Sequence, residues 1–261
     1  MKQLFWRALA IVAIAIPIVL GATPETGPIW RTDIKAPLRA TPNVIFFVAV
    51  GLGFVVWMTW PRRSKFFVTL VHELGHSLTA ALVGGIPVKI TMKRDTSGLA
   101  FYEYSNYPRN WKWRSVAVSA AGYAAPGVAA ISAATAIRAN NAYLWVVFTA
   151  LLMLALLFGL ARSMTVIVVV ILLLAMIGAA LWWAPWSAPG VAALLATIWA
   201  VGGVSGAKNQ LYWIGRRECD ALHIQQQTRI PARIVGWVQI FVAIILAVAA
   251  ALIAIPSEMS F

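Results

Sequence analysis

Apolar runs of about twenty residues recur along this chain, and they limit the folds that it can adopt. An α-helix needs about 20 predominantly apolar residues to cross the hydrocarbon core of a membrane. A window of about 19 residues finds such runs near 8–22, 43–60, 66–86, 115–137, 143–161, 164–184, 189–206 and 234–255. The sequence therefore predicts an all-α polytopic membrane protein with about eight transmembrane helices.

The composition supports this fold class. Hydrophobic residues make up 61% of the 261 residues and charged residues 11%, whereas a typical soluble domain has about 25% charged residues. We find no tandem repeat, no low-complexity tract and no stretch large enough for a separate soluble domain. We therefore expect one membrane-embedded domain over residues 1–261, with its first spans in 1–60.

The net charge of +13 is spread through short loops, which argues against nucleic acid as a partner and favours the lipid bilayer. If eight spans alternate in direction, one face holds fifteen basic residues, including Lys93 and Arg216, and the other holds six. The positive-inside tendency then places the richer face in the cytoplasm and both termini outside. The basic cluster at 61–65 fits this topology least well, because it falls outside.

The motif His72-Glu73-Leu74-Gly75-His76 lies within the apolar run 66–85. Ionisable side chains inside a membrane cost about 2.5–3.5 kcal/mol each on insertion scales, so three of them together need a compensating partner. On a helix, His72 and His76 share one face and can bind the same metal ion, with Glu73 beside them. This spacing is typical of zinc hydrolases, in which the glutamate activates a water at the metal.

A catalytic zinc site usually has three protein ligands, so the histidine pair needs one more. The cluster of Glu218, Asp220 and His223 is the best source, because its loop and the loop after the motif fall on the same side of the membrane. Asp220 is favoured, since a carboxylate keeps the site near neutral, and His223 is the alternative ligand. Asp220 could instead serve as a helix N-cap or form a surface ion pair.

The polar segment after the motif predicts a small β-hairpin. Residues 88–93 alternate between apolar and polar, 94–98 supply turn residues, and 99–104 form a second strand candidate. Such a hairpin could offer an edge to an extended substrate, or it could be a simple surface feature.

Three segments together resemble the M50 (site-2 protease) intramembrane metalloproteases, in particular their compact M50B-like branch. The resemblance is carried by Val71-His72-Glu73-Leu74-Gly75-His76-Ser77-Leu78 with Gly84-Gly85, by Ala121-Gly122-Tyr123-Ala124-Ala125-Pro126-Gly127, and by Asp220-Ala221-Leu222 with Thr228-Arg229-Ile230-Pro231. The chain departs from the broader family pattern with Ala-Pro-Gly at 125–127 and Cys-Asp-Ala at 219–221.

The resemblance implies a family-like catalytic core over 66–237 that holds one zinc ion per chain through His72, His76 and Asp220, with Glu73 as the general base. The expected function is a zinc-dependent intramembrane endopeptidase that cleaves a transmembrane protein or peptide. It would be a multi-pass protein of the cell membrane, with its active site near the cytoplasmic face. The alternative is a non-proteolytic metal-binding membrane protein or transporter, which the scarcity of charge in the other spans disfavours.

Weaker candidates surround this core. Tyr123 would serve either as a hydrogen-bond donor to an oxyanion or in packing, and Asn209 and Gln210 rank lower as polar residues at a span end. Cys219 is expected to be a bystander. The small residues of 119–134 suit close helix packing, either within the chain or in a homo-oligomer.

Overall fold

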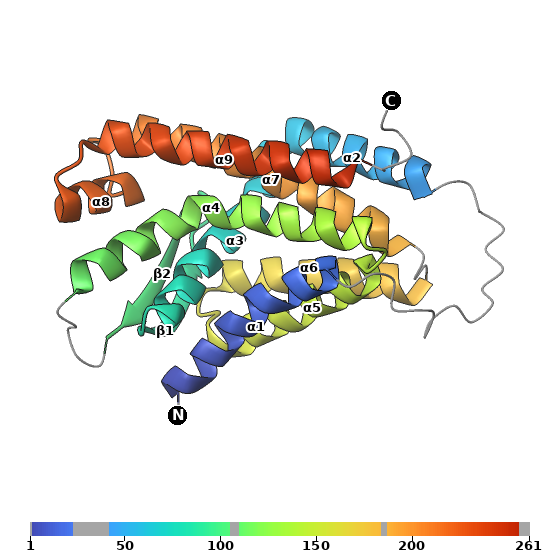
Figure 1. The fold of residues 1–261 in the computed structure, drawn as a ribbon, viewed down its shortest axis with the longest axis horizontal. Coiled ribbons are helices and arrows are strands. Elements are labelled where there is room, and N and C mark those ends of the chain that lie inside the picture. Colours follow the sequence, from blue (N-terminus) through green and yellow to red (C-terminus); the bar gives the residue numbers. More distant parts are fainter. Residues whose placement is uncertain (1, 23–41, 105–109, 184–186, 256–261) are drawn as a thin grey trace.

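The computed structural model describes residues 2–22, 42–104, 110–183 and 187–255. Its elements are α1 (Lys2–Ala22), α2 (Pro42–Thr59), α3 (Pro61–Leu82), β1 (Ile86–Met92), β2 (Gly98–Glu103), α4 (Trp111–Arg138), α5 (Ala142–Gly159), α6 (Met164–Trp183), α7 (Ala188–Trp213), α8 (Asp220–Thr228) and α9 (Ala232–Ala254). The long helices lie roughly side by side, with the hairpin and α8 at one end of the molecule (Figure 1). The predicted helical fold and the predicted hairpin are confirmed.

The predicted count of about eight spans is not confirmed. Among the described residues, α4, α5, α7 and α9 are long and apolar enough to cross a membrane. The apolar stretches at 3–12, 47–59 and 164–179 are shorter, and α3, which carries the charged motif, does not qualify.

Two of the predicted spans, 43–60 and 66–86, run in the same direction and not antiparallel. Gly53 and Trp57 of α2 lie against Thr197 and Gly202 of α7 in turn. Helix α3 passes from Val68, also at Gly202, to His76, which lies beside Asp220 beyond the end of α7. Both helices therefore follow α7 toward the hairpin end (Figure 1). Pro61 starts α3 directly after α2 ends, so the chain bends between them without a reversing loop.

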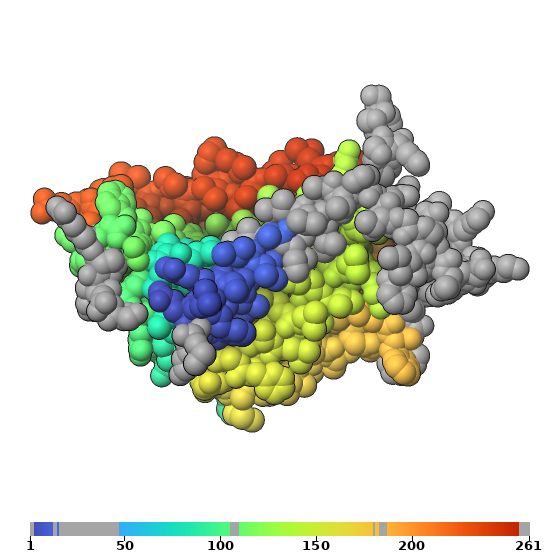
Figure 2. All heavy atoms as spheres, turned by 60° about the horizontal axis from the view of Figure 1, so that its bottom comes forward, coloured from blue at the N-terminus to red at the C-terminus, as the bar shows by residue number. Residues whose placement is uncertain are grey.

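The prediction that the N-terminus and the hairpin lie on opposite sides of the membrane was wrong. The side-chain amide of Gln3, at the start of α1, donates a 2.7 Å hydrogen bond to the carbonyl of Gly84, just before the hairpin. Figure 2 shows α1 on the surface, next to α5. Because α2 and α3 run in the same direction, the chain reverses one time fewer before the hairpin than alternating spans would require. The start of α1 therefore lies at the hairpin end.

Helix α4 occupies the centre of the molecule and packs closely against α3, α7 and α9. Its small residues permit this contact, because a side-chain carbon added at Gly122 would overlap the rings of α3, and one added at Gly127 would overlap Leu246 of α9. The Gly/Ala stretch thus serves packing within the chain.

The hairpin is a two-stranded antiparallel sheet with a bulge between Pro87 and Lys89. On the outer edge of β1, the amide of Ile90 donates to the carbonyl of Leu160 (2.7 Å), and the amide of Arg162 donates to the carbonyl of Ile90 (3.2 Å). The connection between α5 and α6 therefore covers this edge. Ile90 is paired with Ala100, so the backbone groups of Ala100 point away from β1, on the other edge of the sheet.

Candidate metal centre

Helix α3 places the two motif histidines one turn apart on the face that meets α4. Their Nε2 atoms are 3.1 Å apart. Gly122 of α4 lies directly against both rings, and a Cβ at this position would overlap them. The absence of a side chain at Gly122 is therefore what lets α4 approach the histidine pair.

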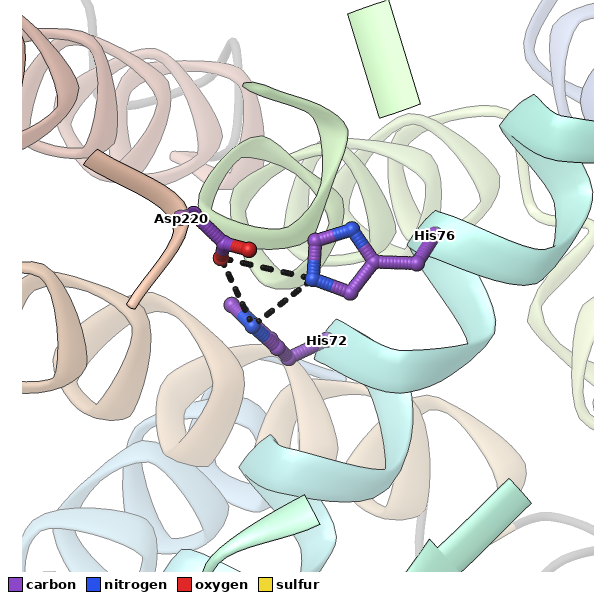
Figure 3. A group of neighbouring side chains, drawn as sticks. All are labelled: His72, His76 and Asp220. Atoms are coloured by element: carbon purple, nitrogen blue, oxygen red, sulfur yellow. Dashed lines mark hydrogen bonds and ion pairs between the residues drawn. The ribbon is translucent and has the colours of Figure 1, made fainter. Parts of the chain in front are cut away.

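Asp220, the first residue of α8, completes the group (Figure 3). Its Oδ2 atom lies 3.3 Å from Nε2 of His72 and 3.3 Å from Nε2 of His76. Four ligands around a tetrahedral zinc with bonds of about 2.0–2.2 Å stand roughly 3.3 Å from one another. The three side chains thus form a possible metal-binding group whose spacing suits zinc.

The surroundings of Asp220 favour its charged form. Burial opposes ionisation, but the positive charge that His76 carries when protonated and the hydrogen bonds from both imidazoles outweigh it and hold the pKa of the carboxyl below its usual range. An ionised carboxylate is the form that can bind a metal.

The ring orientation of His76 is fixed by a backbone group of α4. Its Nδ1 lies 2.6 Å from the carbonyl oxygen of Val118, which can only accept, so Nδ1 carries the proton. The lone pair of the neutral ring then lies on Nε2, the atom that faces His72 and Asp220. Metal-binding histidines are commonly oriented by such a hydrogen bond.

Glu73 lies beside the group, between α3 and the hairpin. Only 5% of its surface is exposed, and a Cβ at Gly98 of β2 would stand 2.5 Å from its Oε1. The carboxylate is therefore packed against the strand edge that carries Ala100.

The other candidates are placed as follows. Among the described residues, His223 and Glu218 are exposed and lie outside the possible metal-binding group. The ring of Tyr123 stands edge-on to His72, with centroids 4.5 Å apart. Cys219 is partly buried, Asn209 is exposed, and Gln210 is completely buried.

Sequence reasoning missed two contributors, the Val118 carbonyl and Gly98. Val118 contributes a backbone atom, which leaves no signal in the side-chain pattern. Gly98 appeared only as a turn residue of the hairpin, and nothing in the sequence pairs it with Glu73.

An apolar cavity of about 560 Å³ lies between α3, α4, α5 and α7. It meets α3 at Val71, Leu74, Gly75 and Leu78, and none of the three possible metal ligands lines it. The candidate metal centre therefore lies outside this cavity.

One of three comparisons with known proteins finds a match. A search of curated proteins and one of solved structures find no match. A family model described as Peptidase M50B-like matches residues 44–252, most of the chain and all of the motifs above. The chain therefore belongs to the Peptidase M50B-like family.

Proposed function

We propose that this protein is a zinc-dependent intramembrane endopeptidase that hydrolyses peptide bonds in transmembrane proteins or peptides. One observation carries the proposal: the carboxylate of Asp220 meets both motif histidines although it lies about 140 residues further along the chain. Membership of a peptidase family supports hydrolysis over simple metal binding.

In this proposal His72, His76 and Asp220 hold one zinc ion per chain. Two imidazole nitrogens and a carboxylate oxygen are a common donor set for catalytic zinc, and three protein ligands leave a fourth position open. When bound, zinc supplies a Lewis acid that polarises a carbonyl and lowers the pKa of water.

Glu73 acts as the general base. It takes a proton from the attacking water as the new carbon–oxygen bond forms, and it gives that proton to the leaving nitrogen as the carbon–nitrogen bond breaks. Its burial next to the ligands supports this role, because burying a carboxylate is costly unless a nearby charge or metal compensates for the lost hydration.

The hairpin holds the substrate extended beside Glu73. A transmembrane helix shields its peptide bonds by its own hydrogen bonds, so it must unwind locally before attack. The amide of Ala100 donates to the carboxylate of Glu73, so an added strand would displace this bond when it pairs with the outward backbone groups of Ala100. The β1 edge is already covered by Leu160 and Arg162. This arrangement supports β2 as the substrate edge.

We place the protein in the cell membrane with the site toward the cytoplasm. Asp95, at the tip of the hairpin, lies 3.6 Å from Arg217 in the loop before α8, so these two basic loops are at the same end of the molecule. The positive-inside tendency supports a cytoplasmic position for that end.

The variant Glu73→Gln tests the function. It retains the size of the side chain and removes the base, so zinc content should stay at the wild-type level while cleavage falls by about 10²–10⁴. The measurements are metal analysis and cleavage of a single-pass membrane substrate in proteoliposomes, with His72→Ala as the control that should lose zinc. Wild-type cleavage by zinc-containing Glu73→Gln would contradict the mechanism and favour a binding or transport role.

A further inference from the structure

Helix α8 carries Asp220, and one amide in its first turn donates a hydrogen bond to a side chain of another helix. The N-cap residue Cys219 makes no side-chain capping bond, although the first amides of a helix need acceptors. The amide of Ala221 donates instead to Oε1 of Gln210, in the last turn of α7, at 3.1 Å. Gln210 thus caps α8 from outside.

The Gln210 side chain is itself held in place. It is completely buried, and its Nε2 donates to Oε1 of Gln239 in α9 at 2.5 Å. The amide of Ala221 can only donate, so Gln210 must present its oxygen to α8 and its nitrogen to α9. A buried amide with partners at both ends has a single favourable orientation.

This capping bond restrains Asp220 through the planar peptide group that joins it to Ala221. The peptide plane that contains the Ala221 amide also contains the Cα atom of Asp220. Holding that amide therefore fixes the start of the Asp220 side chain, whose Oδ2 stands 3.3 Å from each histidine.

We propose that Gln210 is a positioning residue that sets the zinc affinity of the site by fixing Asp220 against the histidine pair. This inference rests on the proposed function, because it concerns the metal that His72, His76 and Asp220 would share.

The opposite end of α8 offers a matched control. Oε1 of Gln225 accepts a 2.7 Å bond from the amide of Ala232, at the start of α9. This is again a glutamine oxygen bound to a helix-start amide, but Gln225 is exposed and lies at the end of α8 away from Asp220. Removing it loosens the junction between α8 and α9 without acting on the Asp220 peptide.

The experiment compares Gln210→Met with Gln225→Met in the full-length protein in detergent. Zinc affinity is measured by competition with a chromophoric chelator, and the Tm of the metal-free protein is measured separately. We expect Gln210→Met to weaken zinc binding by about tenfold or more, as is usual when a partner of a metal ligand is lost, and Gln225→Met to stay within about twofold of the wild type. Wild-type affinity in Gln210→Met, or equal weakening in both variants, would overturn the proposal.

If Gln210→Met does not fold, Gln239→Met provides the test. It retains the Gln210 side chain but removes the partner that orients it toward Ala221, so the capping bond is weakened and zinc affinity should fall several-fold. Unchanged affinity would overturn the proposal.

Zinc binding by the wild type and by His72→Ala distinguishes a failure of the proposed function from a failure of the role of Gln210. If they bind zinc equally, the proposed function fails, whatever the glutamine variants do. If His72→Ala loses zinc and Gln210→Met does not, only the role of Gln210 fails.

Discussion

At the scale of single residues, two glycines decide where the reactive side chains can stand. Gly122 lies against the rings of His72 and His76, and Gly98 lies against the carboxylate of Glu73. In both cases the three atoms nearest to the added carbon belong to side chains and not to the backbone. An alanine there should displace the functional group while the fold is retained.

The two alanine variants should therefore separate metal binding from catalysis. Gly122→Ala should weaken zinc binding by about tenfold or more, because it shifts two ligands. Gly98→Ala should retain zinc and lower kcat, because it moves only the base. Gly51→Ala, with nothing within 4 Å of the new carbon, is the control and should change neither. Zinc loss in Gly98→Ala, or none in Gly122→Ala, would show that the rings and the carboxylate do not lie as described.

The identity of the third ligand can be tested with the two nearby candidates of α8. Asp220→Ala should cost most of the bound zinc, because it removes the oxygen that faces both histidines. His223→Ala should leave zinc content unchanged, since His223 is exposed and outside the group. Metal analysis of the two purified variants decides, and full zinc content in Asp220→Ala would reassign the ligand.

At the scale of elements, the hairpin is held beside α3 by the segment that joins α5 to α6. Ser163 is central to this contact, because its Oγ accepts a 3.0 Å bond from the amide of Met92 and lies 3.3 Å from the carbonyl of Met92. Backbone bonds at Ile90 complete the attachment. The position of β2 beside Glu73 therefore depends on residues far from the motif.

Ser163→Ala should loosen the end of the hairpin. The amide of Met92 loses its acceptor, which typically costs about 1–3 kcal/mol when the group stays buried. Hydrogen exchange over 86–103, followed by mass spectrometry, should become faster, while exchange in α7 stays unchanged. Ser97→Ala, at the exposed turn, is the matched control. Equal exchange in Ser163→Ala and wild type would contradict this attachment.

At the scale of the whole molecule, the hairpin end and the opposite end differ in the basic residues that the described segments place there. Arg7, Lys93, Arg94, Arg216 and Arg217 belong to segments at the hairpin end. Arg138 ends α4 at the opposite end. With the start of α1 at the hairpin end, Lys2 and Arg7 join the basic residues of that end. The positive-inside tendency therefore still predicts that this end faces the cytoplasm.

Cysteine accessibility can test this arrangement in a Cys219→Ser background. Single cysteines at Leu4, Lys93 and Arg216 should react with a membrane-impermeant maleimide only after the cells are opened, because all three lie at the end that we propose faces the cytoplasm. A cysteine at Arg138 should react in intact cells. Labelling of Leu4→Cys and Lys93→Cys from opposite sides would contradict the described course of α1 to α3.

Local patterns predicted much of this protein, and distant contacts account for the rest. The spacing of His72 and His76 is a property of one helix, and the hairpin follows from alternation and turn residues. The parallel course of α2 and α3 was missed, because two apolar runs separated by a short basic segment look the same whether or not the chain reverses. The bond from Gln210 to Ala221 depends on how α7 meets α8, which no local pattern encodes.

The covered edge of β1 has a consequence for how copies of this protein behave together. An uncovered strand edge is a template on which other chains can pair without selection, and such edges promote aggregation. Here one edge is closed by Leu160 and Arg162, and the other lies against the buried Glu73. Within the described part of the chain, a foreign strand can therefore join the sheet only along the β2 edge beside Glu73, which protects the hairpin from edge-to-edge association between neighbouring molecules.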